Sequence, residues 1–243
     1  MARAGSGPLM RATLATAALL PVLAVQGLTM RRTIPRLPGA EGPTTGTTTG
    51  AGDPLRLAVL GESTAAGVGA RTHDVGLAGR LAAALSARGH AVSWQVSARI
   101  GANAHVTRTE LAPALDPADI VVVVLGVNDV IEFHTATRWT RDLLRLLIDL
   151  RATHGRVVLA GVPPMARFPA LPRPLRSVLG LRAAELDAAA ARIARQVPGA
   201  AHVPLPHELI DGDLFCADRF HPSEAGYALW ADGLAAAVSA GPR

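Results

Sequence analysis

The residues best suited to chemistry lie at two distant places in the sequence. Ser63 stands two residues after Gly61, where a short apolar run, Leu57–Leu60, ends. Near the other end, Asp218 and His221 lie within the segment Asp-Arg-Phe-His-Pro. A serine hydroxyl is a weak nucleophile until a base removes its proton, and an imidazole can accept and return a proton near neutral pH. We therefore expect Ser63 to be a nucleophile, His221 its general base, and Asp218 the group that holds the imidazole tautomer.

The elements that must position these residues alternate between strands and helices. Apolar, β-branched runs predict five strands: Leu57–Leu60, Ala91–Ser97, Ile120–Leu125, Val157–Gly161 and Ala201–Pro204. Helical spacing of apolar residues predicts helices between them: Gly76–Arg88, Val106–Leu115, Thr137–Thr153, Leu181–Val197 and Ser223–Ser239, the last N-capped by Ser223. This alternation predicts an α/β fold with a parallel, doubly wound sheet of about five strands.

Several polar or small residues follow the predicted strands directly. Ser63 follows the first strand, Gly101 and Asn103 the second, and Asn128 the third. Because ligands bind at the carboxyl ends of strands in such sheets, we expect these positions to converge with the segment that carries His221.

Four short motifs give the sequence a specific resemblance. They are Ser63 in Gly-Glu-Ser, Gly101, Asn128 in Gly-Val-Asn-Asp, and His221 in Asp-Arg-Phe-His-Pro. In this order and spacing, over about residues 55 to 240, the chain resembles the SGNH hydrolases, also called the GDSL lipase/esterase family. The resemblance implies a flavodoxin-like, three-layer α/β/α domain. It also implies an oxyanion hole made by the backbone N–H groups of Ser63 and Gly101 and the side-chain amide of Asn128.

One position departs from the family pattern. Glu62 precedes the predicted nucleophile where the family usually has Asp, so the support of the serine turn is expected to differ. Each motif residue also has an ordinary alternative: Ser63 as a helix N-cap, Asn128 as a turn residue, His221 and Asp218 as loop residues. We expect Asp129 to brace its loop, Cys216 to be a packed thiol, and the remaining histidines to bind no metal.

The proline-rich stretch Met165–Leu181 interrupts the alternation. Its plainest interpretation is a surface loop with apolar anchors. The alternative is a lid or wall that binds an acyl chain or rests on anionic lipid, in which case Phe168 and Leu171 would affect long-chain esters most.

The N-terminal part of the chain has a different composition. Residues 12–30 carry no charge and lie between arginines, which predicts a membrane anchor, with a cleaved signal peptide or a docking helix as alternatives. We assign residues 1–37 to this segment, 38–54 to a flexible Gly/Thr/Pro linker, and 55–243 to the hydrolase domain. A membrane-associated or exported protein is expected, with a cytoplasmic one as the alternative.

Charge and composition exclude other classes. The formal net charge is +5. Residues 1–53 hold five Arg against two acidic residues and the rest nineteen Arg against seventeen, so the main domain has little excess charge for binding nucleic acid. The glycine-rich run after Gly61 lacks the Lys-Ser/Thr pair of a phosphate-binding loop.

These observations predict a serine esterase that acts on a small-molecule or lipid ester through an acyl-Ser63 intermediate. They call for no metal and no organic cofactor. Two alternatives stay open: an acyltransferase that uses the same site, and a non-catalytic binding domain of the same fold.

Overall fold

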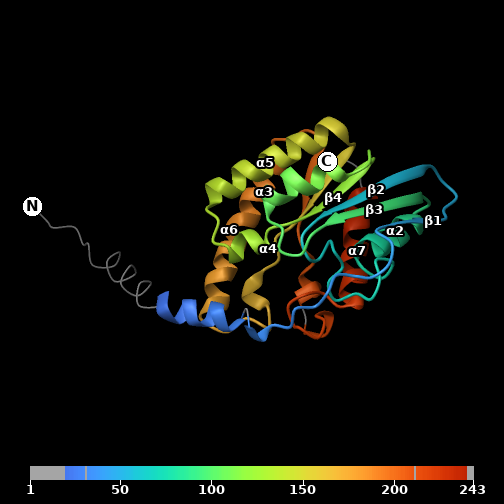
Figure 1. Ribbon diagram of the computed structural model, residues 1–243. Coiled ribbons are helices and arrows are strands. Elements are labelled where there is room, and N and C mark those ends of the chain that lie inside the picture. Colours follow the sequence, from blue (N-terminus) through green and yellow to red (C-terminus); the bar gives the residue numbers. More distant parts are fainter. Residues whose placement is uncertain (1–19, 31, 211, 240–243) are drawn as a thin grey trace, which may run out of the picture.

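The computed structural model describes residues 20–30, 32–210 and 212–239, and a six-stranded sheet lies at its centre (Figure 1). The strand order is β1-β3-β2-β4-β5-β6, and all neighbours are parallel except the edge pair β1 and β3. The bounds are β1 Thr45–Thr48, β2 Pro54–Gly61, β3 Ala91–Ala98, β4 Ile120–Val124, β5 Arg156–Ala160 and β6 Ala200–Val203. The five parallel strands have the flavodoxin-like order, which confirms the predicted fold class and adds one antiparallel strand.

Both faces of the sheet are buried, which explains why the central strands are apolar without alternation. In β4, Val121 and Val123 face one core, while Ile120, Val122 and Val124 face the other. Helices α2 (Leu77–Ser86) and α7 (Glu224–Ser239) cover one face. Helices α5 (Ala136–Thr153) and α6 (Leu175–Ala194) cover the other. The result is three layers.

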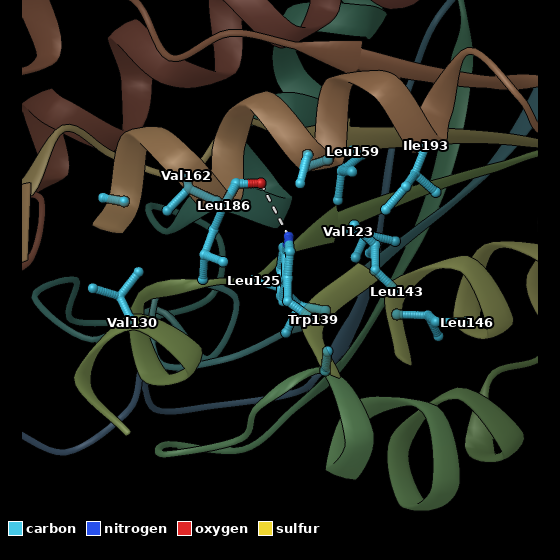
Figure 2. Packing of buried hydrophobic residues seen from close by; sticks show 14 of the residues in the cluster. Val123, Leu125, Val130, Trp139, Leu143, Leu146, Leu159, Val162, Leu186 and Ile193 are labelled. Carbon is cyan, nitrogen blue, oxygen red and sulfur yellow. Dashed lines mark hydrogen bonds between the residues drawn. The ribbon is translucent and has the colours of Figure 1, made fainter. Parts of the chain in front are cut away.

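One aromatic side chain in the core under α5 and α6 connects the two helices. Trp139 is fully buried, and its Nε1 donates a 3.0 Å hydrogen bond to the carbonyl of Leu186 (Figure 2). The indole N–H therefore keeps a hydrogen-bond partner although it is buried, and this hydrogen bond connects α5 to α6.

Two predicted segments differ in detail. Helix α6 begins at Leu175, six residues before the predicted start, because Leu175 and Leu179 already point into the core. Within the stretch Met165–Leu181, residues 175–181 therefore belong to α6. Residues 165–174 form the expected loop with apolar anchors: a short 3-10 turn, Met165–Arg167, and buried Phe168 and Leu171 between exposed residues. The predicted helix Val106–Leu115 is instead α3 (Ala104–Val106), a π-helical turn (Thr107–Leu111) and a 3-10 turn (Ala112–Ala114). Pro113, which lacks an N–H, interrupts regular helix there.

The predicted flexible linker over residues 38–54 is wrong for its central part. Thr45–Thr48 forms β1 and pairs with β3 in register Gly46↔Trp94. A side chain on Gly46 would overlap the Trp94 ring, so glycine allows the close approach. The β-branched threonines favour the extended conformation. Upstream, Ala40 N–H donates to the Ala66 carbonyl at 2.8 Å and Glu41 N–H to the Arg71 carbonyl at 2.9 Å.

The N-terminal segment is described from residue 20. Residues 20–30 are helical and lie against the beginning of α6 (Figure 1). Among the described residues, no helix is both long and apolar enough to cross a membrane. Residues 12–19 of the predicted anchor lie outside the described residues.

Candidate active site

Ser63 lies at the carboxyl end of β2, beside the point where the sheet order reverses between β2 and β4. Gly61 has φ +152°, and a Cβ there would overlap the Val124 carbonyl, so only glycine fits the end of the strand. The turn that follows is closed by a 3.0 Å hydrogen bond from Val68 N–H to the Ser63 carbonyl. Tyr227 Oη, from α7, donates to the Val68 carbonyl at 2.7 Å and anchors this turn.

The structure brings the three predicted catalytic side chains together. His221 Nε2 lies 2.9 Å from Ser63 Oγ, and His221 Nδ1 lies 2.6 Å from Asp218 Oδ2. With Nδ1 protonated and directed at the carboxylate, Nε2 is free to accept the serine proton. Although 158 residues separate Ser63 from His221, the two are in direct hydrogen-bond contact.

Asp218 is held as a carboxylate by its surroundings. Burial alone would raise its pKa, but hydrogen bonds from the His221 side chain, the backbone N–H groups of His221 and Phe220, and Cys216 outweigh burial and lower the pKa to about 2. The thiol of Cys216 donates to Asp218 Oδ1 at 3.1 Å, and burial raises its own pKa to about 11. Cys216 is thus a neutral donor to the carboxylate, in addition to the packed thiol that the sequence predicted.

The predicted oxyanion donors differ in their availability. The backbone N–H groups of Ser63 and Gly101 have no hydrogen-bond partner within the part of the chain that is described. The Asn128 amide nitrogen, by contrast, donates to Glu62 Oε2 at 2.5 Å and to the Ala102 carbonyl at 3.0 Å. Both of its hydrogens are engaged, so Asn128 must share or release one before it can stabilise an oxyanion.

Glu62 is the residue that engages Asn128. Its carboxylate is 2% exposed and also accepts the N–H groups of Val127 and Asn128, each at 3.1 Å. Burial is the dominant effect on Glu62 and raises its pKa to about 8, although the hydrogen bonds from Asn128 and Val127 oppose the shift. Glu62 thus joins the serine turn to the start of α4 (Val127–Ile131), a contact that the sequence pattern did not predict.

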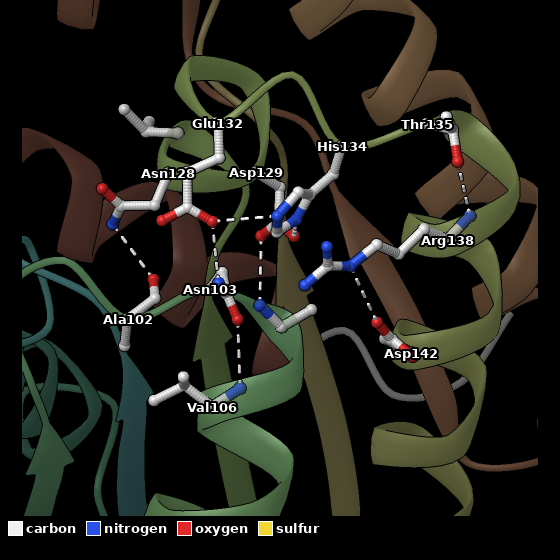
Figure 3. Close-up of polar contacts among 12 residues, drawn as sticks. Ala102, Asn103, Val106, Asn128, Asp129, Glu132, His134, Thr135, Arg138 and Asp142 are labelled. Atoms are coloured by element: carbon white, nitrogen blue, oxygen red, sulfur yellow. Dashed lines mark hydrogen bonds and ion pairs between the residues drawn. The ribbon is translucent and has the colours of Figure 1, made fainter.

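A second set of polar contacts holds the loop after β3 against the loop after β4 (Figure 3). Asp129 accepts the Ala104 N–H at 3.1 Å and contacts His134 Nδ1 at 2.8 Å. Glu132 contacts His134 Nε2 at 3.0 Å and accepts from Asn103 Nδ2 at 2.8 Å. Asn103 also caps α3 through the Val106 N–H. The expectation that Asp129 braces its loop is confirmed, and Asn103 and His134 serve the same bracing network.

A narrow apolar cleft opens beside Ser63, with about 570 Å³ of empty space including its mouth. Phe168 contacts the rings of Phe215 and Phe220 edge to face, at centroid distances of 5.4 and 5.0 Å. The cleft is also lined by Leu205, Leu209 and Trp230. These residues come from three separate segments, and none belongs to a motif except Phe220, which precedes His221. Leu171 does not line the cleft.

The raised pKa of Glu62 predicts a pH-dependent loss of stability. A carboxyl group whose pKa is higher in the folded state stabilises the fold fully below its ordinary pKa of about 4.5, and this contribution is lost as pH rises to about 8. Each pKa unit corresponds to about 1.4 kcal/mol, so we expect a decrease on the order of a few kcal/mol in the free energy of unfolding.

Urea denaturation of the wild type and of Glu62→Gln between pH 5 and pH 9 measures this decrease. The variant cannot ionise at this position, so its unfolding free energy should change less over that range. Parallel curves for the two proteins would show that Glu62 does not titrate there.

Within the described residues no cluster of histidine, cysteine and acidic side chains could hold a metal ion. The site consists of a serine hydroxyl, an imidazole and a carboxylate in continuous contact beside an apolar cleft, on the carboxyl edge of a parallel sheet.

Comparison with known proteins agrees with this arrangement. Residues 59–229 match the GDSL-like Lipase/Acylhydrolase family, and the chain belongs to that family. A curated relative, the GDSL-like esterase Rv1075c of Mycobacterium tuberculosis, is 32% identical over 199 residues. That alignment covers 74% of this chain, and the chain spans 60% of the length of the relative.

Solved structures share the fold. The psychrotrophic esterase EstA from Pseudoalteromonas sp. aligns with a TM-score of 0.61 at 17% identity, over 76% of this chain and 97% of its own. The acetylxylan esterase Axe2 from Geobacillus stearothermophilus aligns with a TM-score of 0.56 at 16% identity, over 76% of this chain and 94% of its own.

Proposed function

We propose that this protein is a serine esterase that hydrolyses carboxylic esters through an acyl-Ser63 intermediate. The observation that carries the proposal is the continuous contact from Ser63 Oγ through His221 to Asp218 at the mouth of an apolar cleft. Membership of the acylhydrolase family and the names of its relatives support ester hydrolysis as the reaction class.

In the proposed reaction, Ser63 Oγ attacks the ester carbonyl carbon while His221 Nε2 takes the hydroxyl proton. The carbonyl oxygen becomes an oxyanion, for which the N–H groups of Ser63 and Gly101, without a partner among the described residues, are the proposed donors. When the C–O bond breaks, Nε2 returns the proton to the departing alkoxide, leaving an ester of Ser63. Water then attacks this ester, again losing its proton to Nε2, and the carboxylic acid and free Ser63 are released.

Hydrolysis of p-nitrophenyl esters from acetate to palmitate tests the proposal directly. The full chain should hydrolyse at least one of these esters with saturation kinetics, and the product acid should appear in equal amount to nitrophenol. A folded protein that hydrolyses none of them would reject the esterase assignment. Acyl transfer to an added alcohol in place of the free acid would favour the acyltransferase.

The wall of the cleft predicts which acyl groups fit. Phe168 is 4% exposed and forms the centre of the aromatic wall, so shortening it removes apolar contact with a chain longer than acetyl. We expect Phe168→Leu to lower the ratio of kcat/KM for octanoate over acetate by about five- to tenfold.

Leu171→Val is the matched control for this substitution. Leu171 is buried in the same stretch but does not line the cleft, so the octanoate-to-acetate ratio should stay unchanged. An equal change of the ratio in both variants would mean that Phe168 acts through packing and not through contact with the acyl chain.

A further inference from the structure

The helix over residues 20–30 has one side fixed to the domain. Met30 is buried in the core under α5 and α6, and Leu23 packs against the same core. Gln26 Oε1 accepts the N–H of Leu175 at 3.0 Å, and Gln26 Nε2 donates to the Arg173 carbonyl at 2.6 Å. Positions 23, 26 and 30 recur at helical spacing, so a single side of the helix makes these contacts.

The opposite side is apolar and exposed. Val22, Val25 and Leu28 are 43%, 63% and 57% exposed, and they recur every three residues. Phe133, just after α4, is 50% exposed and lines, with Leu20, Leu23, Leu28 and Met30, a groove between this helix and the domain. We call Val22, Val25 and Leu28 on the outward side, with the exposed groove residues Leu20 and Phe133, the apolar face. Clustered apolar exposure of this kind marks an interaction surface.

Arginines flank the apolar face, and the acidic residue that lines its groove, Glu132, is engaged by Asn103 and His134. No residue from 20 to 30 is charged, and exposed Arg32 and Arg36 follow directly in the chain. Arg173, also exposed, lies where Gln26 contacts the start of α6. An uncharged helix with large outward apolar residues and flanking arginines fits the interface of an anionic bilayer, with the apolar side chains among the acyl chains and the guanidinium groups at the phosphates.

The location of the apolar face agrees with this partner. Phe133 follows α4, which begins at Val127 just after the end of β4, so the face lies on the carboxyl edge of the sheet. The helix over residues 20–30, in blue, and the orange-to-red segment that leads into α7 both lie along the lower edge of the molecule in this view (Figure 1). In sequence, the uncharged run also continues upstream to Ala12.

We propose that the apolar face docks this protein onto the surface of a bilayer that contains anionic lipid, with the helix over residues 20–30 lying in the plane of the interface. The docking does not depend on ester hydrolysis.

Flotation of the full chain with vesicles tests the docking. Vesicles of phosphatidylcholine with 30% phosphatidylglycerol should bind the wild type, and pure phosphatidylcholine vesicles should bind it much less. The variant Val25→Ser/Leu28→Ser should bind at least tenfold more weakly, because two exposed apolar side chains no longer enter the bilayer. Arg32→Gln/Arg36→Gln should lose about fivefold per charge at low salt.

Ile148→Ser supplies the matched control, since Ile148 is 53% exposed but lies on α5 and outside the apolar face. Its binding should equal that of the wild type. Equal binding by the wild type and the Val25→Ser/Leu28→Ser variant, or no binding to anionic vesicles, overturns the proposal. If that variant instead changes a dimer to a monomer in light scattering, or lowers the unfolding temperature, while vesicle binding is unaltered, a second copy or residues 1–19 cover the face and the proposal fails.

Discussion

Replacing Ser63 by alanine is expected to reduce kcat/KM for ester hydrolysis by about 10⁴-fold or more. The substitution removes the hydroxyl oxygen that lies 2.9 Å from His221 Nε2, so the proposed acyl-enzyme cannot form. Residual hydrolysis would come from binding and oxyanion stabilisation alone. Kinetics with the best p-nitrophenyl ester measure the loss, and mass spectrometry after a fluorophosphonate should place the adduct on Ser63 in the wild type only.

Ser93→Ala is the control for this experiment. Ser93 is an exposed residue of β3, so its replacement should leave both the rate and the labelling unchanged. Activity retained by a folded Ser63→Ala protein would contradict the proposal that Ser63 is the nucleophile. Lost labelling with retained hydrolysis would point to a different nucleophile.

The second large effect is expected at Asp218. Asp218→Asn keeps the size of the side chain, but its amide nitrogen cannot accept a hydrogen bond from the Nδ1–H of His221. The neutral imidazole then carries its proton on Nε2, the atom that must take the serine proton. We therefore expect kcat to decrease by about 10³- to 10⁴-fold. Because the pKa of Asp218 is lowered to about 2, the wild-type carboxylate stays ionised across the whole assay range, and the effect should persist from pH 6 to pH 9.

Cys216→Ser provides the comparison for Asp218. The serine hydroxyl can replace the thiol as a donor to Asp218 Oδ1, so activity should fall by less than about tenfold. Thermal unfolding of both variants separates catalytic from structural loss, since Asp218 also accepts two backbone N–H groups of its own loop. An Asp218→Asn enzyme as active as Cys216→Ser would mean that the carboxylate does not orient the imidazole.

The fold and the contact between Ser63 and His221 could be predicted from the sequence because both follow from the geometry of a parallel sheet. Parallel strands end on one edge, so residues that follow successive strands are neighbours regardless of their distance in the chain. Local patterns were also reliable where one residue determines the structure: Ser223, predicted to cap α7, accepts the Gly226 N–H at 3.2 Å.

The features that could not be predicted depend on tertiary contacts. The threonine-rich segment becomes β1 only because Trp94 and the β3 edge are available to it. The engagement of the Asn128 amide by Glu62 depends on a loop geometry that motif spacing does not encode. The residues of the apolar cleft come from distant segments, and a Phe or Leu that lines a cleft has the same local pattern as one that fills a core.

Strand β1 also determines which fragments of the chain are expected to aggregate. Thr45–Thr48 occupies the outer edge of β3, and Gly46 lies over Trp94. Cutting the chain at residue 54, or cleaving it there with a protease, would leave an unprotected sheet edge and an uncovered indole. Bare edges of this kind pair with other chains, so we expect such a fragment to aggregate. Recombinant protein that begins before residue 38 keeps that edge closed.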